Sequence, residues 1–208
     1  PDGLLNHRED VARTLAALEV HHAHVVGCSL GAGVAVELAL EHAGTVASLL
    51  LLSPAGTLIT AMTPELREFV RAEDVAVERG DLDAAVQANL DWWVDGPHRG
   101  ADVERATIRD HVACMQRRAF ELTAGWDAHE DELDSPALGR LGEIRAPTLV
   151  LTGGLDLDAI AAAAESLVGS IPNVRHELWP DVAHLPSLER PNDVADLLLS
   201  WFDEVEAP

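Results

Sequence analysis

A near-continuous apolar run over residues 46–53 places the strictest limit on how this chain can fold. The run reads V-A-S-L-L-L-L-S and is closed by Pro54 and Gly56. Because neighbouring side chains of a strand point to opposite faces, a strand this apolar must be covered on both faces. Strands of that kind are typical of a parallel sheet with helices on either side. The run therefore predicts an α/β fold.

The segments around this run alternate between helix and strand patterns. Asn6 and the acidic residues after it indicate a capped amphipathic helix that ends near Val20. The remaining expected elements are strands at 24–28, 148–152 and 174–179, and helices at 30–42, 159–168 and 193–205. This order predicts a mostly parallel sheet flanked by helices.

The middle of the chain has a different composition. Residues 61–142 are rich in charged, helix-favouring residues broken by glycines, and they contain no strand-like run. We therefore expect a helical cap inserted between two strands of one sheet. On this interpretation, residues 1–60 and 143–208 form the two parts of the core and residues 61–142 form the cap.

Charge and cysteine content exclude several classes of function. The 208 residues include 36 acidic and 14 basic ones, a formal charge of −22, which argues against a nucleic-acid partner. Cys28 and Cys114 stand far apart, so neither a disulfide framework nor a zinc cluster is expected, and a cytoplasmic location is the default. His22 and His24 would share a strand face, but no carboxylate or cysteine at ligand spacing accompanies them, so no metal is expected.

Membrane association is not expected either. The longest apolar run is far below the length that spans a bilayer, and no charged segment followed by an apolar stretch opens the chain. These features predict a soluble protein.

Residues 27–31 spell G-x-S-x-G between an expected strand and an expected helix. A serine hydroxyl becomes a useful nucleophile only when it is exposed, has an adjacent base and faces donors for the developing oxyanion. A tight strand-to-helix turn would expose Ser29, with Gly27 and Gly31 removing Cβ atoms that would clash. Leu30 would offer its backbone N–H to the oxyanion. The alternatives are an incidental serine in a glycine-rich turn, or Cys28 as nucleophile, although we expect Cys28 to be buried in packing.

The base and the acid are expected in loops that follow the carboxyl ends of two strands of the same sheet. His184 follows the last expected strand, and Asp156 follows the strand at 148–152. The chain order Ser29, Asp156, His184 is that of a triad on this architecture. The alternative is that Asp156 caps the following helix; Asp158 is the better cap candidate and the reserve acid.

Three segments carry a resemblance to the α/β-hydrolase superfamily, and the resemblance covers essentially the whole chain. Residues 25–33 resemble its nucleophile turn, residues 147–156 its acid strand and residues 183–191 its histidine loop, the last being similar to enol-lactonases and related esterases. The resemblance implies acyl transfer to Ser29 without a metal or organic cofactor. It also implies that apolar cap residues line the substrate site, although they could instead form the core of the cap; these are Trp92, Trp93, Met115, Phe120 and Trp126.

The chain departs from the family in one respect. Family members carry several strands before the first helix expected here, so the strand at 24–28 would lack its neighbour and leave an apolar edge. We hypothesise that the chain is an N-terminally incomplete form, or that another chain or a second copy completes its sheet. Ester turnover by this chain alone, at a rate typical of intact enzymes, would contradict that hypothesis.

Three functions remain open at this point. The first is hydrolysis of a small carboxylic ester or lactone through an acyl-enzyme on Ser29. The second is hydrolysis of carbon–carbon bonds in ring-cleavage products, which uses a similar triad. The third is a non-catalytic binding protein that keeps the fold, because fold alone does not fix function.

Overall fold

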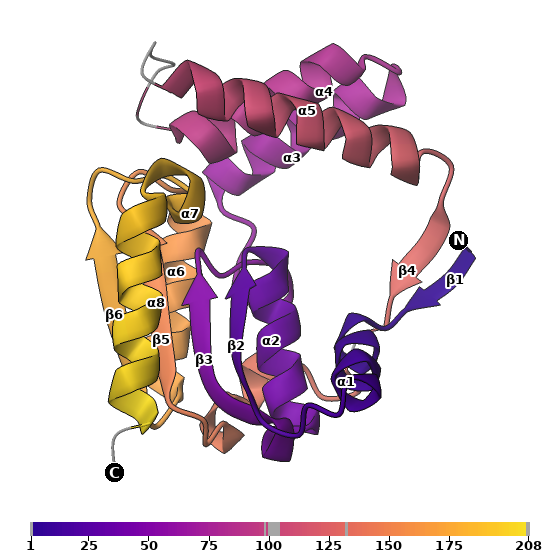
Figure 1. Ribbon diagram of the computed structural model, residues 1–208. Helices are drawn as coiled ribbons and strands as arrows, with labels where there is room; N and C mark the ends of the chain where they lie inside the picture. Colours follow the sequence, from indigo (N-terminus) through magenta and orange to yellow (C-terminus); the bar gives the residue numbers. More distant parts are fainter. Residues whose placement is uncertain (1, 98, 100–104, 132, 207–208) are drawn as a thin grey trace.

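The computed structural model describes residues 2–97, 99, 105–131 and 133–206 of the chain (Figure 1). Its strands are β1 (Asp2–Leu5), β2 (Ala23–Cys28), β3 (Val46–Leu52), β4 (Asp127–Glu130), β5 (Thr148–Gly153) and β6 (Val174–Trp179). Its α-helices are α1 (His7–Ala17), α2 (Leu30–Glu41), α3 (Pro64–Glu78), α4 (Leu82–Asn89), α5 (Ala106–Thr123), α6 (Asp158–Ser170), α7 (Pro186–Glu189) and α8 (Pro191–Glu206). Shorter helical turns are η1 (Ala43–Thr45), η2 (Gly56–Leu58), η5 (Ala137–Gly139), η6 (Leu141–Glu143) and the π-helix η3 (Leu90–Asp95). None of these described helices combines the length and apolarity needed to cross a membrane.

The described strands form two parallel sheets. The main sheet has the order β2-β3-β5-β6, and β1 pairs with β4 in a separate two-stranded sheet. Helices α2 and α6 provide the crossovers from β2 to β3 and from β5 to β6. The four main strands therefore end at one edge, where their arrowheads point in Figure 1. The four strands of the main sheet agree with the expected strands to within one residue at either end, whereas β1 was not expected.

The apolar run that opened the sequence analysis lies in the middle of the sheet and is buried on both faces. Leu49 and Leu51 pack with α2 and α6 on one face. Leu50 and Leu52 pack with α8 on the other, where Trp201 is buried beside them. Removing this apolar area from water is the main force that holds the layers together. The α/β fold predicted from the sequence is confirmed.

The chain between β3 and β5 is mostly helical. Helices α3, α4 and α5 and the π-helix η3, called the helical layer below, lie beyond the carboxyl ends of the main strands (Figure 1). The expectation that residues 61–142 contain no strand is wrong, because β4 pairs with β1 in the register Asp2↔Asp127 to Leu5↔Glu130. The sequence D-A-H-E of β4 is polar and has no strand pattern of its own. Its conformation depends on the distant β1 strand.

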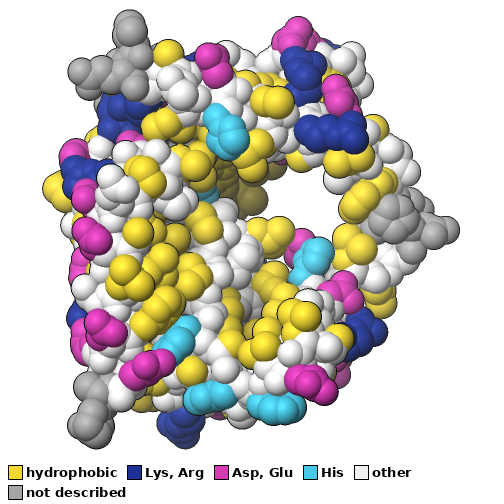
Figure 2. All heavy atoms as spheres, viewed as in Figure 1, with side chains coloured by type: hydrophobic (Ala, Val, Ile, Leu, Met, Phe, Trp, Pro, Cys, Tyr) yellow, Lys and Arg dark blue, Asp and Glu magenta, His cyan; other side chains and the backbone are white. Residues whose placement is uncertain are grey.

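Strand β2 forms an edge of the main sheet. It pairs with β3, and no other described strand pairs with it. Beside it lies an apolar groove of about 540 Å³ lined by α1, β2 and α2, in which Val26 and Leu30 are each 44% exposed. In Figure 2, hydrophobic side chains surround an opening between this part of the molecule and the helical layer. The edge strand expected from the sequence is therefore present in the described residues.

Candidate active site

Ser29 occupies a strained turn between β2 and α2. Its backbone angles are φ 54° and ψ −122°, a region that residues with a side chain rarely adopt. Three backbone hydrogen bonds hold it there: its N–H donates to the Leu52 carbonyl, and its own carbonyl accepts from the N–H groups of Ala32 and Ala55. The strain is therefore balanced by contacts to β3, the loop after β3 and helix α2.

Of the two flanking glycines, only Gly27 lies so close to another backbone segment that a side chain would not fit. A Cβ atom on Gly27 would lie 2.3 Å from the carbonyl oxygen of Gly31 and 2.8 Å from the Cα of Ala32. A Cβ on Gly31 would meet no atom within 4 Å. The expectation that both glycines prevent clashes is correct for Gly27 and wrong for Gly31, because residue 31 already lies in helix α2 with its Cα facing open space.

The His184 ring lies between Ser29 and Asp156. Its Nδ1 is 2.8 Å from Asp156 Oδ2, and its Nε2 is 2.9 Å from Ser29 Oγ. Because an ionised carboxylate can only accept, Nδ1 carries the proton and Nε2 is left to accept from the serine hydroxyl. His184 is 3% exposed and Asp156 is 7% exposed, so bulk water does not compete for these hydrogen bonds.

Asp156 and Asp158 have different surroundings. The other oxygen of Asp156, Oδ1, accepts from the N–H of Leu157 at 2.8 Å, which fixes the carboxylate plane. Asp158 is the first residue of α6, and its Oδ1 accepts from the Thr63 hydroxyl at 2.5 Å. The expectation that Asp158 caps the helix is wrong, because the N-cap position belongs to Leu157. Asp156 alone of the two meets His184.

Cys28 precedes Ser29 but does not have the properties of a nucleophile. Burial, and to a smaller extent the charge of Asp156, raises the pKa of the Cys28 thiol to about 11. Only a thiolate attacks a carbonyl efficiently, and at neutral pH this thiol stays protonated. The expectation that Cys28 is a packing residue agrees with its packing against the cluster that contains Leu50, Leu52 and Trp201.

His22 and His24 do not form a pair. His22 precedes β2, so it does not share a strand face with His24. Both ring nitrogens of His24 already have partners, Ser48 Oγ at 2.8 Å and Glu206 Oε1 at 3.1 Å. Within the described ranges, no group of three His, Cys, Asp or Glu side chains is arranged to hold a metal ion.

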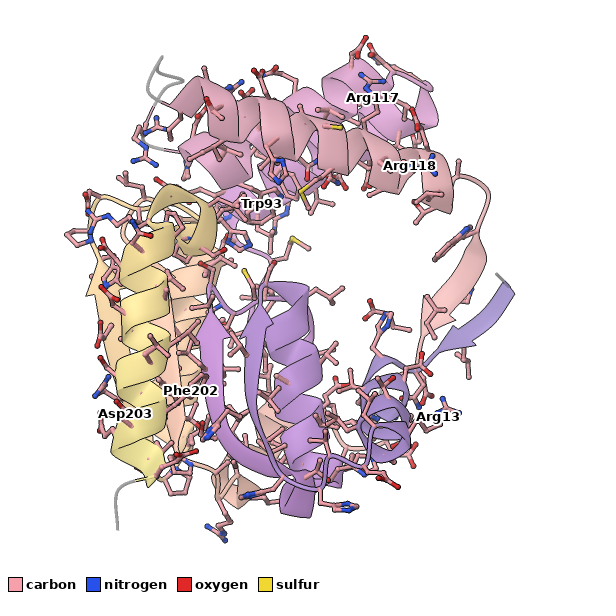
Figure 3. All side chains as sticks on the ribbon, in the orientation of Figure 1. Arg13, Trp93, Arg117, Arg118, Phe202 and Asp203 are labelled. Carbon is pink, nitrogen blue, oxygen red and sulfur yellow. The ribbon has the colours of Figure 1, made fainter. Side chains whose placement is uncertain are left out.

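Trp93 packs directly against the base. Its ring centroid lies 4.1 Å from that of His184. Phe69 of α3 packs edge-to-face with Trp93 at a centroid distance of 4.6 Å, so the indole is held between α3 and the histidine loop. Figure 3 shows Trp93 between the helical layer and the carboxyl ends of the strands. One wall of the site is therefore apolar and aromatic.

The other four residues expected to line the site fall into two groups: Trp92 and Phe120 pack in apolar clusters, and Met115 and Trp126 are exposed. Trp92 packs with Phe69 in a cluster with Leu157, and Phe120 packs in a cluster that also contacts Leu185, next to His184. Met115 is 58% exposed and Trp126 is 46% exposed. Because Trp92 and Phe120 pack within apolar clusters, the alternative of a core role fits these two residues better.

Family comparison identifies the architecture. The model of the alpha/beta hydrolase fold matches residues 3–191. The chain belongs to the alpha/beta hydrolase fold family. The resemblance read from the three sequence segments is thus confirmed, and the relatives of the chain support a hydrolytic role.

Individual relatives are similar to this chain over most of its length. BpoC of Mycobacterium tuberculosis, whose name describes a non-heme bromoperoxidase, is 27% identical over 95% of this chain and 74% of its own length. Est816, described as an N-acyl homoserine lactone degrading enzyme, is 26% identical, with a TM-score of 0.69 over 93% of this chain and 73% of its own. A hydrolase from Pseudomonas aeruginosa PA01 is 26% identical, with a TM-score of 0.72 over 97% of this chain and 74% of its own.

Several residues around the site were not singled out by the sequence. Gly96 has φ 83°, and a Cβ there would lie 2.1 Å from the carbonyl oxygen of Leu155, so the helical layer contacts the acid loop at this point. Arg99 and Glu189 pair beside the histidine loop. Glu189 follows His184 by five residues and could have been noticed for that reason, whereas Arg99 has no sequence signal.

The glycine contacts generate a stability prediction. We expect Gly27→Ala to lower the free energy of unfolding by about 1–3 kcal/mol, because its Cβ meets backbone that cannot move aside cheaply. Gly31→Ala is the matched control, and we expect it to remain within about 0.5 kcal/mol of the parent or to be more stable, because alanine favours the helix. Denaturant unfolding of both variants measures the difference. Equal effects would contradict the close approach at Gly27.

The two cysteines generate a labelling prediction. With a pKa of about 11, Cys28 is thiolate in only about one molecule in a thousand at pH 8, whereas Cys114 lies on the exposed surface. We expect iodoacetamide to modify Cys114 and to leave Cys28 unmodified in the native protein, and to modify both after denaturation. Peptide mapping by mass spectrometry gives the result, and modification of Cys28 as fast as Cys114 would contradict the raised pKa.

Proposed function

We propose that the chain is a serine hydrolase that cleaves a small carboxylic ester or lactone through an acyl-enzyme on Ser29. The observation that carries the proposal is the continuous hydrogen-bonded line from Asp156 through His184 to Ser29, at 2.8 Å and 2.9 Å. This arrangement supplies a nucleophile, a base and a group that orients the base. Its members come from three loops at one sheet edge, the usual position of sites in open α/β sheets.

The proposed reaction has two halves. Ser29 Oγ attacks the carbonyl carbon while His184 Nε2 takes the hydroxyl proton, and Asp156 stabilises the resulting imidazolium through Nδ1–H. The tetrahedral intermediate collapses, and Nε2–H gives the proton to the departing alkoxide, which leaves as an alcohol. Water then attacks the acyl-enzyme with His184 as base, and the acid product leaves with Ser29 restored. In a lactone, the alcohol and the acid belong to the same product molecule.

The oxyanion is the negative charge that this mechanism must stabilise. Leu30 is the first residue of α2, so its N–H is one of the amides that have no acceptor within the helix. The positive end of the helix dipole lies at the same point. We propose that this N–H donates to the oxyanion, and a donor of this kind is worth about 10²–10³-fold in rate in serine hydrolases.

The helical layer is proposed to act as the cap over the site. Trp93 supports this role because it contacts both Phe69 of the layer and His184 of the core. An apolar acyl or ring group could pack on its indole face, while the carbonyl carbon meets Ser29. Trp92 and Phe120 would hold the layer together behind it. Met115 and Trp126, being exposed, would contribute only if a substrate reaches their surface.

The relatives favour acyl chemistry as the reaction class. Est816 is described as degrading an acyl homoserine lactone, and RutD of Pantoea ananatis, 25% identical over 93% of this chain and 68% of its own length, is named as a carbamate hydrolase. Lactones and carbamates both present a carbonyl carbon to a nucleophile.

Covalent labelling tests the nucleophile. We expect a fluorophosphonate probe to form an adduct on Ser29, because the probe reacts with a serine whose proton is taken by a neighbouring base. Ser29→Ala should abolish the adduct, and His184→Ala should slow labelling by about 10²-fold or more. Mass spectrometry locates the adduct.

Ser200→Ala is the matched control for this experiment, since Ser200 is exposed on α8. It should label at the parent rate. An unlabelled parent protein, or an adduct that persists in Ser29→Ala, would overturn the proposal and favour a binding protein that keeps the fold.

Substrate turnover tests the reaction class. We expect hydrolysis of aryl esters and lactones, with kcat lowered about 10²–10⁴-fold in Asp156→Asn because the amide no longer fixes the Nδ1–H tautomer. A panel that also contains ring-cleavage dienoates separates ester hydrolysis from carbon–carbon bond hydrolysis. Preferred turnover of the dienoates would reject the ester or lactone assignment while keeping Ser29 as nucleophile.

A further inference from the structure

A largely buried ion pair lies beside the loop that carries His184. Arg99, which follows η3, donates from Nη2 to Glu189 Oε2 at 2.7 Å and from Nη1 to the Asp181 carbonyl at 2.7 Å. The Glu189 side chain is 8% exposed and that of Arg99 is 20% exposed. The pair therefore joins the end of the helical layer to both sides of the histidine loop.

The second oxygen of Glu189 holds the backbone next to the base. Oε1 accepts from the N–H of Ala183 at 2.7 Å, and Ala183, which immediately precedes His184, has no exposed surface. One carboxylate thus binds both the Arg99 guanidinium and the peptide that leads into His184. Hydrogen bonds to charged groups are stronger than neutral ones, and removing one partner of a buried pair leaves an uncompensated charge.

Contacts on the other side fix Arg99 itself. Its Nε donates to the Asp95 carbonyl at 3.1 Å. The Asp95 carboxylate is buried and ion-paired with Arg109 of α5. Gly96, between Asp95 and Arg99, lies so close to Leu155 that no Cβ fits. Asp95 therefore ties Arg99 to the helical layer, while Gly96 packs on the acid loop.

We propose that Glu189, clamped by Arg99, is a positioning residue for His184. The proposal rests on the serine-hydrolase function proposed above. Neither side chain touches the reacting atoms: Glu189 acts through the Ala183 amide and Arg99 through the Asp181 carbonyl. Together they set where His184 Nε2 meets Ser29 Oγ. A displacement of about 1 Å at such a contact costs about 10²-fold in rate, so this backbone support matters to the chemistry.

Kinetics of single and double variants test the proposal. For an aryl ester, we expect Glu189→Ala to lower kcat about 10–10²-fold with KM changed by less than about two-fold, since the base and not the substrate site is displaced. Glu189→Gln keeps an oxygen that can accept from Ala183 but turns its NH2 group toward the Arg99 donors, so it should recover kcat only in part, to a value between those of Glu189→Ala and the parent. Arg99→Ala should add little to the loss in Glu189→Ala, because the two residues act as one unit.

Glu204→Ala is the matched control. Glu204 pairs with Arg175 at 2.5 Å, so the variant also removes the acid of an Arg–Glu pair, between α8 and β6. Its kcat should stay within about two-fold of the parent. Circular dichroism melting of every variant fixes an assay temperature at which all are folded. If Glu189→Ala does not fold, the single variants Glu189→Gln and Arg99→Lys replace it in the test. Arg99→Lys should also lower kcat, because one lysine nitrogen cannot contact both Glu189 and the Asp181 carbonyl as the guanidinium does.

Amide hydrogen exchange gives a readout that does not depend on turnover. The Ala183 amide should exchange at least about ten-fold faster in Glu189→Ala than in Glu204→Ala, since it loses its acceptor only in the former. Equal kcat in Glu189→Ala and Glu204→Ala, additive losses, or no rescue by Glu189→Gln would overturn the positioning role. Failure of Ser29 labelling in the parent would instead reject the proposed function, and the exchange result would still decide whether Glu189 holds the loop.

Discussion

The turn at Ser29 depends on the close crossing of two backbone segments at Gly27. The chain leaves β2, reverses at Ser29 and enters α2 so sharply that the Gly31 carbonyl occupies the space of any Cβ at residue 27. Ser29 has a positive φ at this crossing, and hydrogen bonds from the N–H groups of Ala32 and Ala55 to its carbonyl hold it. Packing and hydrogen bonds elsewhere in the fold therefore compensate for the backbone strain at Ser29, whose hydroxyl lies at the carboxyl ends of the strands.

The base reaches this hydroxyl through a loop that is supported from two directions. Trp93 packs on the ring of His184 from the helical layer. Asp156, from the loop after β5, accepts from its Nδ1. Because these supports come from parts of the chain far apart in sequence, the relation between His184 and Ser29 is a property of the whole fold. A helical layer that shifted as a body would carry Trp93 and thereby disturb the imidazole.

The sequence predicted the four strands of the main sheet, the crossover helices and the three residues that meet at the carboxyl ends of those strands, because these follow from apolar runs and from a motif that needs one local backbone shape. It predicted neither β1 nor β4; the residues of β4 are polar, and among the described strands β4 pairs only with β1. It treated Gly31 as equivalent to Gly27, since a motif shows which residues are present and not which atoms approach each other. Met115 and Trp126 were expected at the site from their apolar character, yet exposure depends on long-range placement that composition does not encode.

The uniform leucine run of β3 has a consequence for how the sheet finds its alignment. Leu49 to Leu52 would bury equally well if the strand slid by one residue, because both faces are apolar. Such a slide, about 3.3 Å along the strand, would carry the end of β3 away from the Ser29 amide that donates to Leu52. A slid strand would also lose the side-chain contact between the Ser48 hydroxyl and His24 Nδ1, which are 2.8 Å apart at the start of the run. The side chain of Ser48 therefore favours the observed register of a strand whose leucines alone would not distinguish it from a register shifted by one residue.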